Sequence, residues 1–112
     1  MEFDEETNKN IEELRSLENQ LQGLLAHKQA AQIEVNEIEN AVREIGESDG
    51  EIYKVVSGIM IKSERRKLEE ELNEKKRELE KNIESLEKQE RLVSKNANEL
   101  KNKVNKAVRK SK

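Results

Sequence analysis

The stretch EIYKVVSGIMIK, residues 51–62, decides how the rest of this sequence is interpreted. It is dominated by β-branched, aromatic and other apolar side chains, and the pair Ser57-Gly58 stands in its middle. That pattern is typical of a β-hairpin closed by a tight turn. With a two-residue turn, the apolar residues divide between its faces, with Ile52, Val56, Ile59 and Ile61 on one and Tyr53, Val55 and Met60 on the other.

Both faces of this hairpin are therefore largely apolar. A lone two-stranded hairpin is marginally stable in water, and exposed apolar patches usually mark interaction sites. One short chain has too little else to cover two such faces. We expect these seven residues to form an assembly hairpin that packs against other subunits.

The sequence before the hairpin predicts a long helix over residues 8–45. Apolar residues follow one another at spacings of three and four, interrupted only by Lys28, and this is the heptad of a coiled coil. Thr7, Asn8 or Asn10 could cap the helix, and Gly46 suits a left-handed residue that ends it. The apolar positions of this seam are Leu14, Leu17, Leu21, Leu24, Ala31, Val35, Ile38, Val42 and Ile45.

The sequence after the hairpin predicts a second helix over residues 64–109. Its heptad is weaker, because Lys75 or Lys76, and Gln89 or Glu90, fall on the seam. The apolar positions of this second seam are Leu68, Leu72, Leu79, Ile83, Leu86, Val93, Ala97, Leu100, Val104 and Ala107.

Two long helices joined by a short connector fold most simply into an antiparallel pair. Placing Ile45 near Arg65 brings Leu24 beside Leu86. The same register brings the acidic residues near the N-terminus beside the basic residues near the C-terminus, so these charges attract. Lys28 then either sets the register as a polar seam residue or extends its amine past Asn82 and Ile83 to solvent, and the sequence leaves both open.

Composition excludes several functional classes. Charged residues make up 42% of the 112 residues and hydrophobic ones 32%, far from the balance of a compact globule. There is no cysteine and only one histidine, His27, so disulfides and the usual zinc-site spacings are absent, and we expect no metal and no cofactor. A two-helix coiled coil offers no pocket for acid–base chemistry, so we expect no enzyme activity. The acidic N-terminus and the lack of a long apolar run predict a soluble, cytoplasmic protein with no membrane partner.

Taken together, these features resemble the β subunit of archaeal prefoldin over roughly residues 8–108. The specific part is the hairpin, Glu-Ile-Tyr-Lys-Val-Val-x-Gly-x-x-Ile. It lies between a heptad helix and a second one containing Leu-Glu-Glu-Glu-Leu and Ile-Glu-Ser-Leu-Glu-Lys-Gln-Glu. Family α subunits carry two hairpins and this sequence has room for one, which indicates β. Gly23 departs from a good helix interior, where glycine costs about 1 kcal/mol relative to alanine.

The resemblance implies a mainly α fold and one prefoldin-like domain over residues 1–112. It also implies an ATP-independent chaperone that assembles as a hexamer of two α and four β subunits. Hairpins of that family join into a β-barrel platform, and coiled coils extend from it. Their tips bind non-native proteins and deliver them to a group II chaperonin.

Apolar residues near the chain ends are candidates for the client-binding tips. Phe3, Ile11 and Val108 fall off the predicted seam, and exposed apolar side chains at mobile ends suit a client-holding surface. The full set of candidates is Phe3, Ile11, Leu14, Leu100, Val104 and Val108.

The alternative to a chaperone is a structural coiled-coil scaffold or an RNA-binding helical arm. The basic segment 101–112 could contact nucleic acid, but it has no aromatic residue for base stacking, and the acidic N-terminal residues would cancel much of its field. We therefore expect no nucleic-acid partner.

Overall fold

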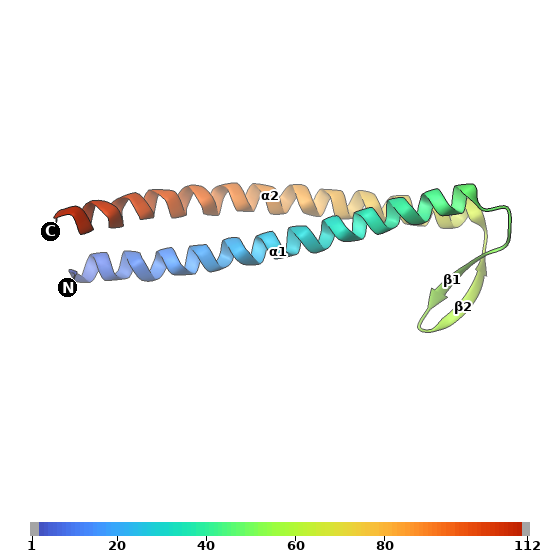
Figure 1. The fold of residues 1–112 in the computed structure, drawn as a ribbon, viewed down its shortest axis with the longest axis horizontal. Helices are drawn as coiled ribbons and strands as arrows, with labels where there is room; N and C mark the ends of the chain where they lie inside the picture. Colours follow the sequence, from blue (N-terminus) through green and yellow to red (C-terminus); the bar gives the residue numbers. More distant parts are fainter. Residues whose placement is uncertain (1–2, 111–112) are drawn as a thin grey trace. The chain divides into compact units, whose positions relative to one another are not determined.

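The computed structural model describes residues 3–110 and contains two long helices with a β-hairpin between them (Figure 1). The order is α1 (Glu5–Glu47), β1 (Ile52–Val56), β2 (Ile59–Ser63) and α2 (Arg65–Lys110). The mainly α fold with one inserted hairpin, predicted from the sequence, is confirmed. Two of the charged residues expected to attract one another near the chain ends, the acidic Glu2 and the basic Lys112, lie outside the described residues.

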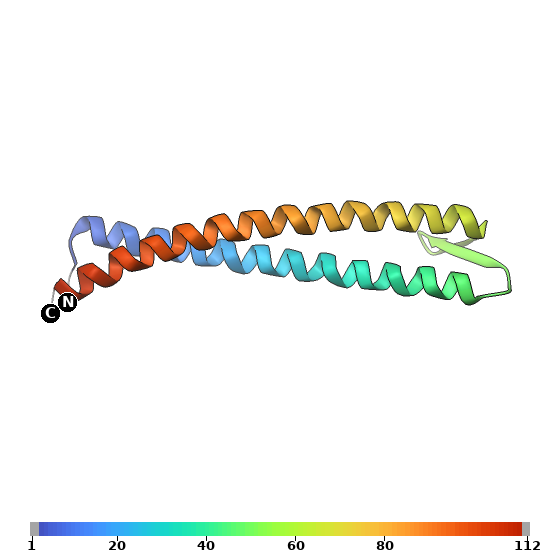
Figure 2. The same ribbon diagram turned by 90° about the horizontal axis from the view of Figure 1, so that it is seen from above.

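The chain divides into two compact units, each formed by a segment of α1 and a segment of α2. Unit 1 comprises Met1–Gln29 and Glu84–Lys112 and so holds both chain ends, while unit 2 comprises Ala30–Ile83 and holds the hairpin. Figure 2 shows α1 and α2 each as one continuous helix. Each unit buries an apolar seam between antiparallel segments, as the heptads predict.

The seam of unit 2 is the better buried of the two. Most of its seam residues from α1 are almost fully covered, with Val35 only 3% exposed, while Val42 is half-buried. In unit 1 the seam leucines of α1 are half-buried, because the facing helix segment covers them only in part. The buried residues are Ala31, Val35, Ile38, Ile45 and Leu68 in unit 2, and Thr7, Leu86 and Ala97 in unit 1.

The start of α1 differs from the sequence prediction. The helix begins at Glu5, and its cap is Asp4, whose Oδ1 accepts a hydrogen bond of 2.7 Å from the Thr7 backbone N–H. An aspartate at this position satisfies an N–H group that the helix leaves unpaired. Hydrogen bonds from the Thr7 side chain and backbone hold the pKa of Asp4 below its usual value. The expected caps Thr7, Asn8 and Asn10 lie inside the helix instead.

The end of α1 also differs. Gly46 lies within the last turn, has no left-handed backbone conformation, and is followed by helix as far as Glu47. A side chain from the other helix ends α1 instead, because the Arg65 guanidinium donates hydrogen bonds to the carbonyl oxygens of Ile45 and Gly50. The predicted proximity of Ile45 and Arg65 is thus confirmed.

The pairing register inferred from that proximity is wrong. Lys28 contacts Glu90, not Asn82 and Ile83, so within unit 1 the partner lies about two helical turns further along α2. Arg65 has a long side chain, and its contact with Ile45 therefore does not place the two backbones level. The ion pairs also settle which polar residues occupy the α2 seam, because Lys76 and Glu90 are partly buried whereas Lys75 and Gln89 are exposed.

Candidate functional site: the hairpin and the paired helix ends

The two strands pair antiparallel around a tight turn. Val56 lies opposite Ile59 and Val55 opposite Met60, so Ser57 and Gly58 form a two-residue loop. Both have positive φ, 50° at Ser57 and 80° at Gly58, which is the signature of a type I′ turn. This turn matches the right-handed twist of the strands, and glycine occupies its second position without steric cost.

The predicted division of the hairpin into two faces is confirmed. Residues that lie directly opposite share a face, so Lys54 joins the face of Ile61 and Lys62 joins the face of Tyr53. Three apolar side chains near the turn are about two-thirds exposed, Val55 at 68%, Met60 at 66% and Ile59 at 64%. Residues this apolar and this exposed on both faces of one short hairpin form an unpartnered surface.

An ion pair and apolar packing hold the base of the hairpin against the helix segments of unit 2. Lys54 Nζ lies 3.3 Å from Glu71 Oε2, an ion pair that links β1 to α2. Ile52 is half-buried and lines a groove together with Ile45, Leu68 and Leu72. The strands are therefore held at their helix-proximal end and exposed toward their turn.

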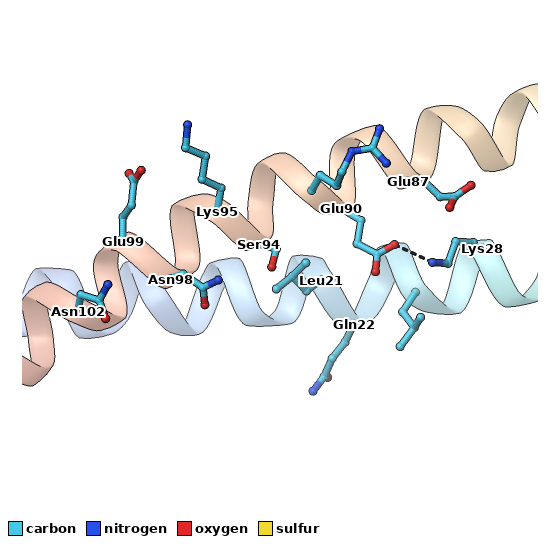
Figure 3. A pocket seen from close by; sticks show the side chains of 12 residues that line it. Leu21, Gln22, Lys28, Glu87, Glu90, Ser94, Lys95, Asn98, Glu99 and Asn102 are labelled. Carbon is cyan, nitrogen blue, oxygen red and sulfur yellow. Dashed lines mark hydrogen bonds and ion pairs between the residues drawn. The ribbon is translucent and has the colours of Figure 1, made fainter.

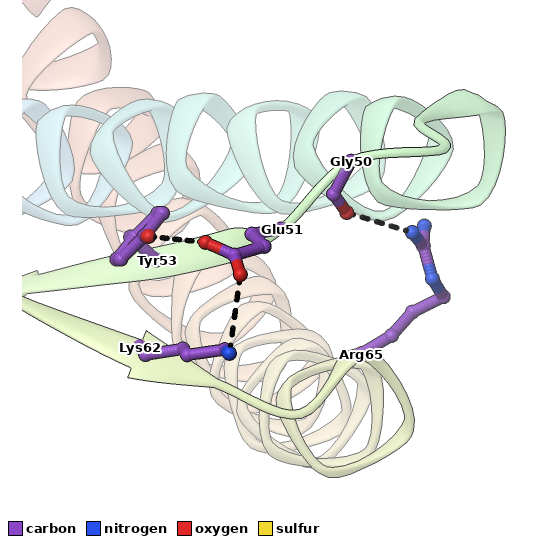
Figure 4. A network of polar contacts seen from close by, with 5 residues as sticks. All are labelled: Gly50, Glu51, Tyr53, Lys62 and Arg65. Carbon is purple, nitrogen blue, oxygen red and sulfur yellow. Dashed lines mark hydrogen bonds and ion pairs between the residues drawn. The ribbon is translucent and has the colours of Figure 1, made fainter.

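One carboxylate joins both strands on the Tyr53 face (Figure 4). Glu51 accepts a 2.5 Å hydrogen bond from the Tyr53 hydroxyl, and its other oxygen lies 3.2 Å from Lys62 Nζ. Hydrogen bonds from Tyr53 and then from Lys62 lower the pKa of Glu51, and the bond to Glu51 raises the pKa of the Tyr53 phenol. The polar end of this face is thus internally paired, and its apolar end near the turn is free of such pairing.

The six candidate tip residues all belong to unit 1, and none is fully exposed. The structure makes each of them half-buried. Thr7 is only 6% exposed, so the seam continues one turn before Ile11 and Leu14. Phe3, Ile11 and Val108 are therefore partly covered residues at the edge of a paired helix end.

The paired ends bring opposite charges together, as predicted. Asp4 and Glu6 from the start of α1 line one groove with Lys103, Lys106 and Lys110 from the end of α2. This arrangement also suits the helix dipoles, since acids lie at an N-terminus and bases at a C-terminus.

Sequence reasoning missed three exposed apolar residues on the helices. Leu25 is 43% exposed, Ile33 58% and Leu92 61%. Each lies off the heptad positions of its helix, and an apolar residue off the heptad is the sequence signal that could have predicted its exposure. Because they do not fit the seam, the heptads assign them no role.

No group of three His, Asp or Glu side chains suited to a metal ion occurs in the described part of the chain. Within residues 3–110, neither helix carries an apolar stretch long enough to cross a bilayer.

Comparison with known proteins shows what this architecture is. A family model described as "Prefoldin subunit" matches residues 8–111, nearly the whole sequence. The chain belongs to the prefoldin family. It is 35% identical to the prefoldin subunit beta of Caldivirga maquilingensis over 84% of this chain and 79% of that one. It is 33% identical to the prefoldin subunit beta of Pyrococcus abyssi over 87% and 85%, respectively.

A solved structure supports the same family. The fold is similar to the crystal structure of the prefoldin beta subunit from Thermococcus strain KS-1, with a TM-score of 0.86, 30% identity and 96% of each chain covered. The resemblance to the archaeal β subunit, first based on the hairpin, is thereby confirmed. Prefoldin subunits are chaperones and not enzymes, and they assemble with other prefoldin subunits.

Proposed function

We propose that this chain is the β subunit of an ATP-independent chaperone that binds non-native proteins and delivers them to a group II chaperonin. In this proposal four copies join two α subunits, and the hairpins form a β-barrel platform. The observation that carries the proposal is the hairpin, whose apolar side chains near the turn are exposed on both faces. We expect this activity in the cytoplasm.

The client-binding surface in this proposal lies at the paired helix ends of unit 1. Phe3, Ile11 and Val108 present apolar area that their own chain covers only in part. Each apolar side chain buried by a client can contribute roughly 1.5–3 kcal/mol. Several subunits in one complex multiply such weak contacts through effective concentration.

Shortening the chain to residues 14–98 tests where clients bind. This truncation removes every tip candidate except Leu14 and leaves the hairpin intact. The shortened complex should keep its subunit number, with a mass reduced in proportion. It should no longer suppress the aggregation of a chemically unfolded client, as measured by light scattering at equal complex concentration.

Two pairs of substitutions locate the surface more finely. Phe3→Ser with Val108→Ser should weaken client protection, whereas Leu25→Ser with Leu92→Ser, on the helix flanks of the same unit, should leave it nearly unchanged. Equal protection by the shortened and full-length complexes would contradict the assignment to the helix ends. If only the flank variant loses protection, the client-binding surface contains Leu25 and Leu92 and does not lie at the helix ends.

A further inference from the structure

Lys28 of α1 and Glu90 of α2 form an ion pair at the seam of unit 1 (Figure 3). Lys28 Nζ lies 2.8 Å from Glu90 Oε2, and the two side chains are only 27% and 32% exposed. The hydrogen bond to Glu90 raises the pKa of Lys28, and the charges of Glu90 and Glu87 act in the same direction. Within unit 1 the remaining seam positions from Leu14 to Leu24, and from Leu86 to Val104, are apolar.

The apolar seam by itself permits a second register. A slip of one heptad returns every seam residue to a seam position, because the hydrophobic repeat is unchanged by seven residues. In the observed register Leu24 and Val93 line one groove. In the slipped register Leu86 would take the place of Val93, so leucine would still meet an apolar partner.

The two registers differ sharply at the charged positions. In the slipped register Lys28 would face Ile83 and Glu90 would face Leu21, so both charges would lose their partner and lie against apolar side chains. A partly buried charge without a partner is disfavoured, and a single polar seam residue is an established means of fixing a coiled-coil register. A second polar seam residue, Lys76 in unit 2, also finds an acid in the observed arrangement, since its Nζ lies 3.3 Å from Glu39 Oε1.

We propose that the Lys28–Glu90 ion pair selects the pairing register of α1 and α2 by excluding the register one heptad away. This role goes beyond the proposed chaperone function and does not depend on it. It assigns to Lys28 the register-setting interpretation, which the sequence alone left open.

Cysteine cross-linking in the full-length chain distinguishes the two registers, since the natural sequence has no cysteine. His27 and Gln89 are both exposed and line the same groove, so the pair His27→Cys with Gln89→Cys reports the observed register. Asn82 is exposed and lies one heptad before Gln89, so His27→Cys with Asn82→Cys reports the slipped register. A short thiol-specific cross-linker is applied at low protein concentration, and only products with the mass of one chain are counted.

Each reporter is placed in four backgrounds. In the otherwise natural chain only the Gln89 reporter should cross-link. With Lys28→Leu and Glu90→Leu, the ratio of slipped to observed product should rise by about tenfold or more, the change produced by a difference of about 1.4 kcal/mol between registers. The charge-swapped pair Lys28→Glu with Glu90→Lys should restore the natural pattern.

The fourth background is a matched control. Lys88 and Glu84 form an exposed ion pair 3.9 Å apart within α2, and Lys88→Leu with Glu84→Leu should leave the ratio unchanged. The Lys28→Leu, Glu90→Leu chain should melt at the same or a higher temperature, because apolar replacement of an ion pair that is partly removed from water is often neutral or stabilising. If this chain cross-links only through the Gln89 reporter, the connector sets the register and the proposal is wrong. Slippage in the charge-swapped chain would also overturn it.

Discussion

At the scale of single residues, both ends of α1 are closed by side chains that the heptad does not mark. Asp4 caps the first turn from one residue before the helix, and Arg65 reaches from α2 to the last turn. The sequence alone does not single out these two caps, because Thr, Asn and Gly are also common at helix ends. The cap that forms depends on where the seam ends, and Thr7, buried at 6% exposure, extends that seam by a turn.

Removing the Asp4 carboxylate should fray the first turn of α1. The lowered pKa of Asp4 means that its charged form stabilises the folded helix at pH values above its ordinary pKa of 3.8. That stabilisation should disappear as the pH falls through the lower value of the folded state. Amide hydrogen exchange at Thr7, corrected for intrinsic rates, should therefore accelerate in Asp4→Ala at neutral pH.

Asp4→Asn serves as the control, because its amide oxygen can still accept the Thr7 N–H. It should fray less than Asp4→Ala, and its protection should not change through the pH range in which aspartate titrates. Equal exchange at Thr7 in all three chains at neutral pH would show that Asp4 does not hold the helix end.

Replacing Arg65 should destabilise the junction between the helices and the hairpin. Arg65→Gln removes hydrogen bonds to the carbonyls of Ile45 and Gly50 and should lower the free energy of unfolding by about 1 kcal/mol. Arg66→Gln is the matched control, since Arg66 is exposed and forms an ion pair with Glu70 on its own helix. Both changes remove one positive charge from the N-terminus of α2, so the dipole effect cancels. Urea unfolding followed by circular dichroism measures the difference, and equal losses would contradict the role of Arg65.

At the scale of elements, the hairpin was the most predictable part of the fold. Its strands, its two-residue turn and its two faces follow from local features, namely β-branched residues and Ser57-Gly58 at the centre. The existence and approximate span of both helices follow from the heptads in the same way. The register between the helices did not follow, because heptads repeat and the contacts of polar seam residues, Lys28 with Glu90 and Lys76 with Glu39, are seen only in the structure.

Placing charge on the hairpin should abolish assembly while the helices stay folded. Ile59 and Ile61 lie on the same face and are 64% and 45% exposed, so Ile59→Asp with Ile61→Asp disturbs little within the single chain. In an assembled barrel the two carboxylates would be buried without partners, which is strongly unfavourable. Helicity by circular dichroism should therefore persist while size-exclusion chromatography shows loss of the hexamer.

Ile33→Asp is the matched control for this experiment. Ile33 is a similarly exposed isoleucine of unit 2, but it lies on α1 outside the hairpin. Its substitution should leave the hexamer intact. A hairpin variant that still elutes as a hexamer would show that assembly uses another surface.

At the scale of the whole molecule, the sequence predicts a subunit and not a self-contained domain. A chain with 42% charged residues and apolar side chains on both faces of a hairpin has more apolar surface than it can cover alone. What covers that surface was predictable only through the resemblance to prefoldin, since the hairpin pattern describes an apolar surface and not its partner. The tip residues were less predictable, because their exposure depends on where the helix pairing ends.

The most direct test of assembly through the hairpin is the native mass of the complex formed with an archaeal prefoldin α subunit. The purified chain, of 13.0 kDa, is mixed with the α subunit and measured by native mass spectrometry. We expect one species containing four copies of this chain and two α subunits, and we expect Ile59→Asp with Ile61→Asp to abolish it. A mixture in which the two proteins stay separate, or a mixed complex that survives those substitutions, would contradict it.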